Sequence, residues 1–420
     1  MLTIRTTAVA AVAAALLAGC ASPKYVVHAG TPEPRTTGPL SSKPAADGVS
    51  APPHTPALSA ADIGAAQTAF GVDFLHASCK GPANVVVSAT SAAEALGLLY
   101  AASAGETAKA MGTALHLPPW GPSTIAGTAD HTQALGDIRG PNKGEGLFIS
   151  NHVWTGKESK PTQHYLDDVA TAYKSDVRSV DFAGDAKGAT DAINGSVDKD
   201  THGLIKKLFD QPLDASTTTV LTDAMYLKAR WVQPFEFTTQ QVFHAPSADV
   251  TVPMMSGASG PSREAGGWRS VELPYVGGKL MAVAILPPLR TDPCAITTAQ
   301  LATLTAGPSN SADVLLPKLH VEQTHDLLGP LKALGVPLSG DFSGLGGGSD
   351  VSQAVQKTFL DIDEAGTTAA AATGVAVALS GRMSLTPPIV FDRPYLFLLT
   401  DTATHSPLFT AVVNDPTRQS

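Results

Sequence analysis

The sequence predicts one α+β domain over residues 59–420, because helical periodicity dominates the first half of this region and strand periodicity the second half. This segregation differs from the regular alternation of strands and helices in α/β folds. No internal repeat and no proline-rich linker divides the region, so one large domain fits better than two or three. Hydrophobic residues make up 43% of the chain and charged residues 15%, which supplies enough apolar side chains for a substantial core.

The spacing of apolar residues predicts the elements in chain order. The first helix is expected to begin at Ser59 or Asp62, because either side chain suits a helix N-terminus. The predicted helices span residues 61–76, 91–100, 106–115, 164–173 and 186–201. The predicted strands span residues 84–88, 147–154, 217–227, 270–274, 279–286, 312–317 and 390–400.

Residues 1–19 are typical of an export signal. Arg5 supplies a positive start, and residues 6–19 form an apolar run that is too short to span a bilayer. The run ends in Leu-Ala-Gly-Cys, which resembles the lipobox of bacterial lipoproteins, where acylation of the cysteine (here Cys20) follows cleavage. We expect an exported chain that is lipid-anchored to the outer face of the cell membrane. An ordinary signal peptide followed by a chance cysteine is the alternative.

Residues 20–58 are predicted to form a tether between the acylated cysteine and the domain. Residues 21–58 hold eight of the 32 prolines, many serines and threonines, and few large apolar residues. Proline removes backbone donors and interrupts helices and sheets, so this composition favours an extended linker. The other two cysteines, Cys79 and Cys294, belong to the exported domain, and the sequence leaves open whether they pair.

Composition and missing motifs disfavour several functional classes. A formal net charge of −9 disfavours nucleic-acid binding, because phosphates repel an acidic surface. The chain has no GxSxG, HExxH or Walker A motif, and its 12 histidines lack the spacing of metal ligands. We therefore expect no cofactor, no metal and no enzymatic activity, with a hydrolase on another fold as a remote alternative.

Residues 363–380 form the most informative stretch. Its run of alanines favours a helix. Every second residue from Thr367, however, is small and then apolar, without charge, which suits a strand that buries one face. The stretch alone does not decide between the two structures.

Glu364, Gly366 and Thr367, followed by a run of alanines, resemble the hinge of the inhibitory serpins, the serine protease inhibitor family. Other blocks match this family in the same order over about residues 60–417. They include Asn84-Val85-Val86-Val87-Ser88, Ile193-Asn194, Ala224-Met225-Tyr226-Leu227-Lys228, Val271-Glu272-Leu273-Pro274-Tyr275 and Val413-Asn414-Asp415-Pro416. Each block is weak alone, and their common order makes the resemblance specific.

The resemblance implies about eight or nine helices around three mostly antiparallel sheets, with an exposed reactive loop at about residues 366–387. It also implies a monomeric suicide substrate: a serine protease is acylated by the loop, which then inserts into the central sheet as a new strand. The hinge residues that this mechanism involves are Glu364, Gly366, Thr367, Ala369, Ala370, Ala371 and Ala372.

The scissile bond has three candidates. Family spacing counted from Glu364 places the specificity residue at Ser380, and counting back from Phe391 places it at Met383. Arg382 between them suits a trypsin-like pocket, whereas Met383 suits an elastase- or chymotrypsin-like pocket. We rank Arg382 first, because a charge in a complementary pocket gives strong recognition.

The chain departs from the family at the cluster that controls opening of the central sheet. Ser88 and Ser91 are present, but Asp223 and Gln356 stand where the family usually has an asparagine and a histidine. A buried aspartate without a cation must be well hydrogen-bonded or partly protonated. Trp231 matches the family's breach region, where the loop would enter the sheet.

A non-inhibitory serpin that acts as a carrier or chaperone is the main alternative. It would have bulky, charged or proline residues in the hinge, and none occurs between Gly366 and Gly374. A glycosaminoglycan cofactor would need a basic helix, and residues 117–140 lack lysine, so we expect no such cofactor.

Overall fold

The structure, a computed structural model, describes residues 57–140, 145–346, 350–367 and 387–418. Over these residues it contains eight α-helices and two hydrogen-bonded sheets, so the predicted α+β class is confirmed. None of the described helices has the length and apolar character needed to cross a membrane. The helices are α1 (Ala60–Ser78), α2 (Ala89–Ala102), α3 (Gly105–Ala114), α4 (Pro122–Gly136), α5 (Gln163–Tyr173), α6 (Ala186–Asp200), α7 (Thr298–Thr305) and α8 (Leu328–Ala333).

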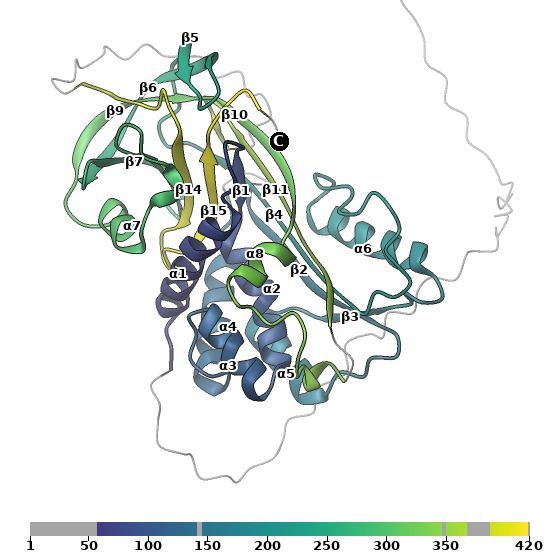
Figure 1. The fold of residues 1–420 in the computed structure, drawn as a ribbon. Helices are drawn as coiled ribbons and strands as arrows, with labels where there is room; N and C mark the ends of the chain where they lie inside the picture. Colours follow the sequence, from purple (N-terminus) through teal and green to yellow (C-terminus); the bar gives the residue numbers. More distant parts are fainter. Residues whose placement is uncertain (1–56, 141–144, 347–349, 368–386, 419–420) are drawn as a thin grey trace, which may run out of the picture. The chain divides into compact units, whose positions relative to one another are not determined.

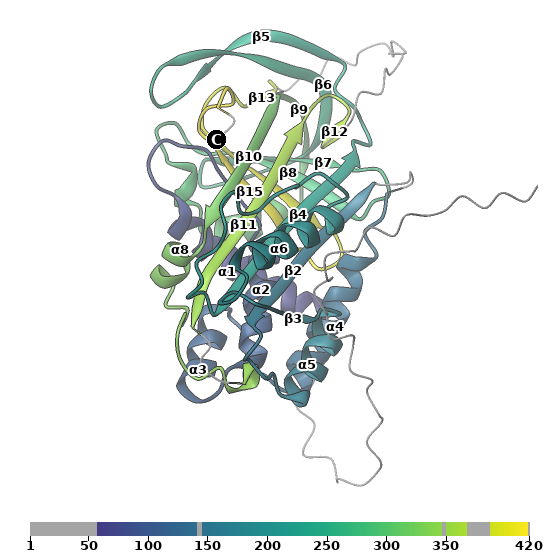
Figure 2. The same ribbon diagram turned by 90° about the vertical axis from the view of Figure 1, so that its right-hand side faces the viewer.

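A six-stranded sheet runs through the centre of the fold (Figure 2). Its order is β10 (Leu319–Asp326), β11 (Val351–Ile362), β12 (Gly366–Thr367), β4 (Thr219–Arg230), β2 (Gly146–Gly156) and β3 (Val177–Val180). Strands β11 and β4 run parallel and pair directly over part of their length, although 120 or more residues separate them in the chain. The short strand β12 lies between them near one end.

The second sheet has nine strands, so the described residues form two hydrogen-bonded sheets where the resemblance implies three. Its order is β1 (Val85–Val87), β15 (Pro407–Val413), β14 (Tyr395–Asp401), β8 (Leu280–Leu286), β7 (Trp268–Pro274), β6 (Asp249–Ala265), β9 (Asn310–Pro317) and β13 (Ile389–Val390), with β5 (Phe237–His244) paired to β6. The long strand β6 pairs with β5 through its first half and with β7 at its end. Because β6 is continuous, the strand paired with its first half and the strands paired with its second half belong to one hydrogen-bonded sheet.

Both faces of the six-stranded sheet are covered (Figure 1). On one face, α6 packs through Ile193 against Trp154 of β2 and Val220 of β4. On the other face, Met225 and Leu227 of β4 belong to the apolar core shared with the nine-stranded sheet. Helix α2 is buried along almost its whole length on this side, because its alanines and leucines let it approach the strands closely.

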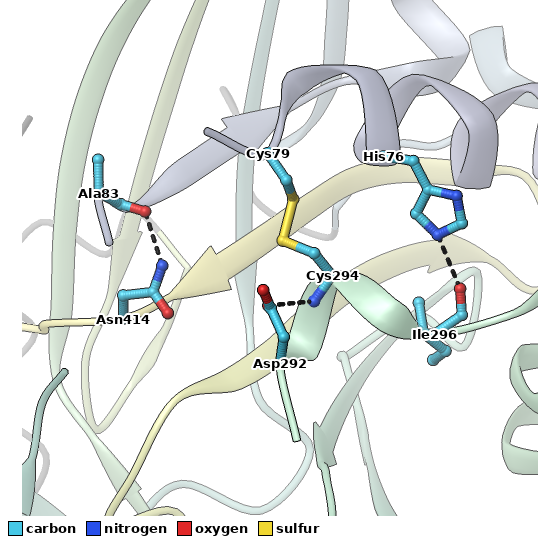
Figure 3. Close-up of a disulfide and its surroundings, with 7 residues drawn as sticks. All are labelled: His76, Cys79, Ala83, Asp292, Cys294, Ile296 and Asn414. Carbon is cyan, nitrogen blue, oxygen red and sulfur yellow. Dashed lines mark hydrogen bonds between the residues drawn. A yellow bond between two sulfur atoms is a disulfide. The ribbon is translucent and has the colours of Figure 1, made fainter. Parts of the chain in front are cut away.

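Helix α1 begins with a capping box that uses both residues suggested by the sequence. The Ser59 hydroxyl accepts a hydrogen bond from Asp62 N at 3.2 Å, and Ser59 N donates to the Asp62 carboxylate at 2.8 Å. At the other end of α1, Cys79 forms a disulfide with Cys294 of the short 3₁₀ helix Pro293–Ala295 (Figure 3). The pairing that the sequence left open therefore links α1 to the segment between β8 and α7.

Candidate functional site

The chain reverses direction through a tight turn directly after β11. The Asp363 carboxylate accepts hydrogen bonds from Ala365 N at 2.7 Å and from Gly366 N at 3.0 Å. Asp363 N in turn donates to the Gly366 carbonyl at 3.0 Å. Aspartate favours such turns because its short side chain can bind the backbone two and three residues ahead. The turn sends the chain back between β11 and β4 as β12.

Strand β12 occupies the first positions of a strand between β11 and β4. Thr367 lies opposite Ile362 of β11 and Ala229 of β4, and Gly366 lies opposite Arg230 of β4. A Cβ atom on Gly366 would lie 2.1 Å from the Ala229 carbonyl oxygen, so the backbones approach too closely for any other residue. The resemblance placed Gly366 in the hinge, and this close approach is a structural reason for glycine at that position.

Thr367 is buried completely at the point where the chain enters the sheet. Its hydroxyl oxygen lies 2.5 Å from the Tyr275 hydroxyl oxygen, and Tyr275 is also fully buried. Burial raises the pKa of Tyr275 well above its ordinary value, so the phenol keeps its proton and can share this hydrogen bond. The pair fixes the first inserted side chain against the segment that follows β7.

Trp231 holds the turn from the side of β4. Its backbone N–H donates to the Ala365 carbonyl at 2.9 Å, and its indole N–H donates to the Asp363 carbonyl at 3.0 Å. The indole also stacks on the Tyr275 ring with 4.3 Å between centroids. Trp231 therefore joins the turn before β12 to the aromatic ring that binds Thr367.

Glu364 is bound to side chains at the edge of the other sheet. Its carboxylate lies 2.6 Å from Lys318 Nζ and 2.5 Å from the Thr238 hydroxyl. Partial burial opposes ionisation, but these two partners hold the pKa of Glu364 below its usual range. The residue is thus an ionised anchor for the hinge.

The six-stranded sheet is closed at one end and occupied by β12 at the other. Direct pairing between β11 and β4 extends to Thr358 and Met225. Further along, Ile362 and Ala229 both pair with Thr367 instead. A strand that continued from Thr367 would have to separate the paired part of β11 and β4, which we call the seam.

The four residues of the predicted sheet-opening cluster lie together across the seam. Asp223 of β4 and Gln356 of β11 are register partners, and Gln356 Nε2 donates to Asp223 Oδ2 at 2.5 Å. Gln356 also binds the backbone of Ser88, accepting from its N–H at 2.9 Å and donating to its carbonyl at 2.8 Å. The Ser91 hydroxyl contacts Asp223 Oδ1. All four residues are buried, with at most 1% of their surface exposed.

Two residues that the sequence did not identify extend this cluster to β2 and further along α2. Asn151 of β2 lies beside Asp223 and contacts the Ser91 hydroxyl through Oδ1 at 2.8 Å. Its Nδ2 donates to the Ser91 carbonyl and to the carboxyl group of Glu94, both at 3.1 Å. Glu94 is 8% exposed. Burial, with a contribution from the Asp223 charge, raises the pKa of Glu94 to about 8.

The remaining predicted site residues lie outside the described residues. These are Cys20, the hinge alanines Ala369, Ala370, Ala371 and Ala372, and the scissile-bond candidates Ser380, Arg382 and Met383. In the part of the chain that the structure describes, no three His, Cys, Asp or Glu side chains are grouped as metal ligands would be.

Comparison with known proteins agrees with this geometry. A family model described as Serpin (serine protease inhibitor) matches residues 65–416. A serpin-like protein of Thermococcus kodakarensis is 30% identical over 348 residues, covering 79% of this chain and 81% of that protein. The leukocyte elastase inhibitor of Bos taurus is 30% identical over 386 residues, covering 84% of this chain and 99% of that protein.

Solved structures show the same fold. The thermophilic serpin tengpin in its native state has a TM-score of 0.74 at 24% identity, covering 84% of this chain and 94% of that one. Human thyroxine-binding globulin in complex with its hormone has a TM-score of 0.73 at 25% identity, covering 86% and 100%. The order of the strands, the hinge that enters the central sheet and the family match over most of the chain lead to one conclusion: this protein belongs to the serpin family.

Proposed function

We propose that this serpin is inhibitory and traps an extracellular serine protease by inserting its cleaved loop into the six-stranded sheet. The observation that carries the proposal is β12, where Thr367 already pairs with both β11 and β4 and Gly366 pairs with β4. Residues that follow Thr367 and alternate small and apolar side chains could extend this strand along the seam.

The proposed chemistry begins as ordinary proteolysis. The protease serine oxygen attacks a loop carbonyl carbon, the peptide C–N bond breaks, and the released amine takes up a proton. An ester then joins the loop to the protease, and water would normally hydrolyse it. Inhibition requires that insertion be faster than this hydrolysis. Ala369, Ala370, Ala371 and Ala372 favour fast insertion, because their side chains add little bulk.

The proposed partner is a trypsin-like protease, with cleavage after Arg382. Cleavage after Met383 by an elastase- or chymotrypsin-like enzyme is the second possibility, and cleavage after Ser380 the third. This proposal involves no nucleic acid, no glycosaminoglycan and no cofactor. The protein would act as a monomer, and it would inhibit an enzyme without being one.

The test is incubation of the purified domain with trypsin, chymotrypsin and elastase in turn. An inhibitory serpin is expected to give a complex that survives SDS, together with a released C-terminal peptide. Mass spectrometry of that peptide identifies the bond, because cleavage after Arg382 gives a peptide that begins at Met383. Arg382→Ala should abolish the complex with trypsin, whereas Met383→Ala should retain it. Cleavage by all three enzymes without any stable complex would contradict the proposal.

A carrier function is the second candidate, and the likeness to thyroxine-binding globulin favours it. That function requires no loop insertion. The small, uncharged residues after Thr367 favour the inhibitory function instead, because a carrier has no need of a hinge that fits a sheet. The same protease panel separates the two, since a carrier would be cut without trapping the enzyme.

We also propose that the protein is a lipoprotein on the outer face of the cell membrane, with residues 1–19 removed and residues 20–58 serving as a tether. Cys20→Ala is expected to move the protein from the membrane fraction to the soluble or precursor pool, because the acylated thiol is lost. Fractionation followed by immunoblotting checks this, with Cys79→Ala as the control that leaves Cys20 intact. Unchanged fractionation of the Cys20→Ala variant would refute the lipid anchor.

A further inference from the structure

The Ser91 hydroxyl has two neighbouring acceptor oxygens but only one proton to donate. Its single hydroxyl proton faces two oxygens, Asn151 Oδ1 and Asp223 Oδ1. The orientation of the Asn151 amide is fixed, because its Nδ2 lies 3.1 Å from the Ser91 carbonyl, which can only accept. Asn151 Oδ1 must therefore accept the Ser91 proton. The contact between Ser91 and Asp223 then lacks a hydrogen unless the carboxyl group supplies one.

The other carboxyl oxygen of Asp223 is already satisfied. Gln356 cannot reverse its amide, because Ser88 N must meet its oxygen and the Ser88 carbonyl must meet its nitrogen. Gln356 Nε2 therefore donates to Asp223 Oδ2. Every contact in the cluster then has one donor and one acceptor only when Asp223 Oδ1 carries a proton and donates it to the Ser91 oxygen.

No described cation compensates a charge on Asp223. Among the ionisable side chains of the surrounding elements, Glu94 of α2, Tyr173 of α5 and His325 of β10 lie on the side of the sheet that Asp223 faces, while His152 of β2 and Lys357 of β11 point to the opposite face by strand alternation. Burial lowers the pKa of His325, so this imidazole is neutral, and its Nε2 binds the Val86 carbonyl at 2.8 Å. Glu94 would add a second negative charge.

We propose that Asp223 is a neutral carboxylic acid in the folded protein, and that its proton holds β4 to β11 at the seam. Loss of this proton would leave a buried charge across the seam and would force the Ser91 hydroxyl to turn away from Asn151. Ionisation therefore weakens the closed sheet at the place where a loop strand would enter. The effect on loop insertion rests on the proposed inhibitory function, whereas the effect on stability does not.

The direction of the pH dependence follows from the raised pKa. Burial raises the pKa of Asp223 to about 7, although the hydrogen bond from Gln356 favours the ion. In an unfolded chain an aspartate ionises near pH 3.9. Between these values the folded chain holds a proton that the unfolded chain has lost, so stability falls as pH rises from about 4 to about 7. Glu94 extends the fall to about pH 8.

A route for proton exchange leads from Asp223 to solvent. Ser91 and Asn151 connect Asp223 to Glu94 by hydrogen bonds. Glu94 lines a cavity of about 540 Å³ beside β2, together with Asn151, Tyr173 and Asp176. The cavity is open to solvent, so the buried acid can follow the external pH.

The decisive variant is Asp223→Asn, which replaces the neutral acid by a neutral group of the same shape. The Asn amide can donate to Ser91 and accept from Gln356, as the protonated acid does. We expect the melting temperature of the wild type to fall between pH 5 and pH 8. The Asp223→Asn variant should lose the part of this fall that Asp223 causes, keep the part that Glu94 causes, and melt at least about 5 °C higher than the wild type at pH 8. Asp130→Asn, on the exposed side of α4, is the matched control and should behave like the wild type.

Two results would overturn the proposal. The first is an Asp223→Asn variant that is less stable than the wild type at pH 8 or that fails to fold, because an ionised native carboxylate would lose its bonds. The second is the absence, in the infrared difference spectrum between wild type and variant at pH 5, of a protonated carboxyl band that disappears at high pH. The wild-type melting temperature could fall with pH, and the variant could melt higher at pH 8, while no protease is trapped. Asp223 would then still be a neutral acid, and only the proposed inhibitory function would be refuted.

Discussion

At the hinge, two neighbouring residues are fixed by different physical requirements. Gly366 is required because a Cβ atom would meet the Ala229 carbonyl oxygen, and Thr367 is held because its buried hydroxyl has a partner in Tyr275. The later loop residues that would share the buried face of Thr367 must also be small or apolar to enter the sheet. A charge at Thr367 is therefore the most direct test of insertion.

Thr367→Arg is expected to convert the proposed inhibitor into a substrate. The guanidinium would enter a site where Thr367 is fully buried, and an unpaired buried charge costs several kcal/mol. Insertion should slow, while acylation at a distant bond proceeds at a similar rate, so the protease completes hydrolysis and leaves. Residual protease activity after incubation at increasing molar ratios measures the effect.

Thr368→Arg is the control for this experiment. Strand alternation predicts that residue 368 faces away from residue 367, so a charge there should do less harm. If Thr367→Arg traps the protease with unchanged stoichiometry, insertion is not the mechanism and a rigid blocking loop would replace it.

Single residues also show how far the sequence alone could lead. Ser88, Ser91, Asp223 and Gln356 were grouped from the resemblance, and the structure places them in contact. Glu94 gave no signal, because one glutamate in an alanine-rich helix normally faces solvent. Its burial depends on how α2 packs against β2, which sequence periodicity does not specify.

At the scale of elements, the disulfide joins the end of α1 to a short 3₁₀ helix that belongs to neither sheet. Cys79 is the residue at the C-terminal end of α1, and Cys294 lies 215 residues further along the chain. Beside it, His76 Nε2 contacts the Ile296 carbonyl at 2.9 Å (Figure 3). A cross-link over this separation removes many conformations from the unfolded chain.

The double variant Cys79→Ser/Cys294→Ser is expected to lose about 2–4 kcal/mol of stability, because the closed loop is lost from the unfolded state. Urea unfolding followed by circular dichroism gives the difference. A reducing agent should shift the wild type by a similar amount and leave the double variant unchanged. Equal midpoints for wild type and double variant would show that the bond adds nothing to stability.

Strand β6 shows why some elements could not be predicted. Its 17 residues contain Pro253, Gly257, Gly260 and Pro261, which are typical turn or loop signals. The register with β9 shifts between Met255 and Ala258, and Gly257 in that interval has a φ of +96°. The strand exists because β5, β7 and β9 pair with it, and such pairing is not visible in a single segment. Helices with regular apolar spacing, such as α5 and α6, were predicted to within one or two residues of their ends.

At the scale of the whole molecule, the proposed mechanism would place one more strand between β11 and β4 of the central sheet. Two residues of β12 occupy its entrance, and the direct pairing of β11 with β4 closes the rest. Filling this place would add a full row of backbone hydrogen bonds and bury more apolar surface. The intact fold would then be a less stable arrangement than the fold with an inserted strand.

Cleavage within residues 368–386 is therefore expected to raise the melting temperature by tens of degrees. This exceeds the roughly 2–8 °C that corresponds to one kcal/mol in a typical domain, because a complete strand is gained. Calorimetry of intact and cleaved protein makes the comparison, with Thr367→Arg as the variant that should gain least. A cleaved form that melts at or below the intact form would identify a serpin that does not insert its loop.

The contacts of Trp231 give the molecule an optical reporter of its own hinge. Its indole bonds to the Asp363 carbonyl, stacks on Tyr275 and is nearly inaccessible to water. The other three tryptophans, Trp120, Trp154 and Trp268, lie elsewhere in the fold and would be replaced by phenylalanine for this measurement. Fluorescence of the remaining indole would then change in wavelength or intensity as the turn at Asp363 straightens. Loop movement could thus be timed in a stopped-flow mixer without attaching a dye.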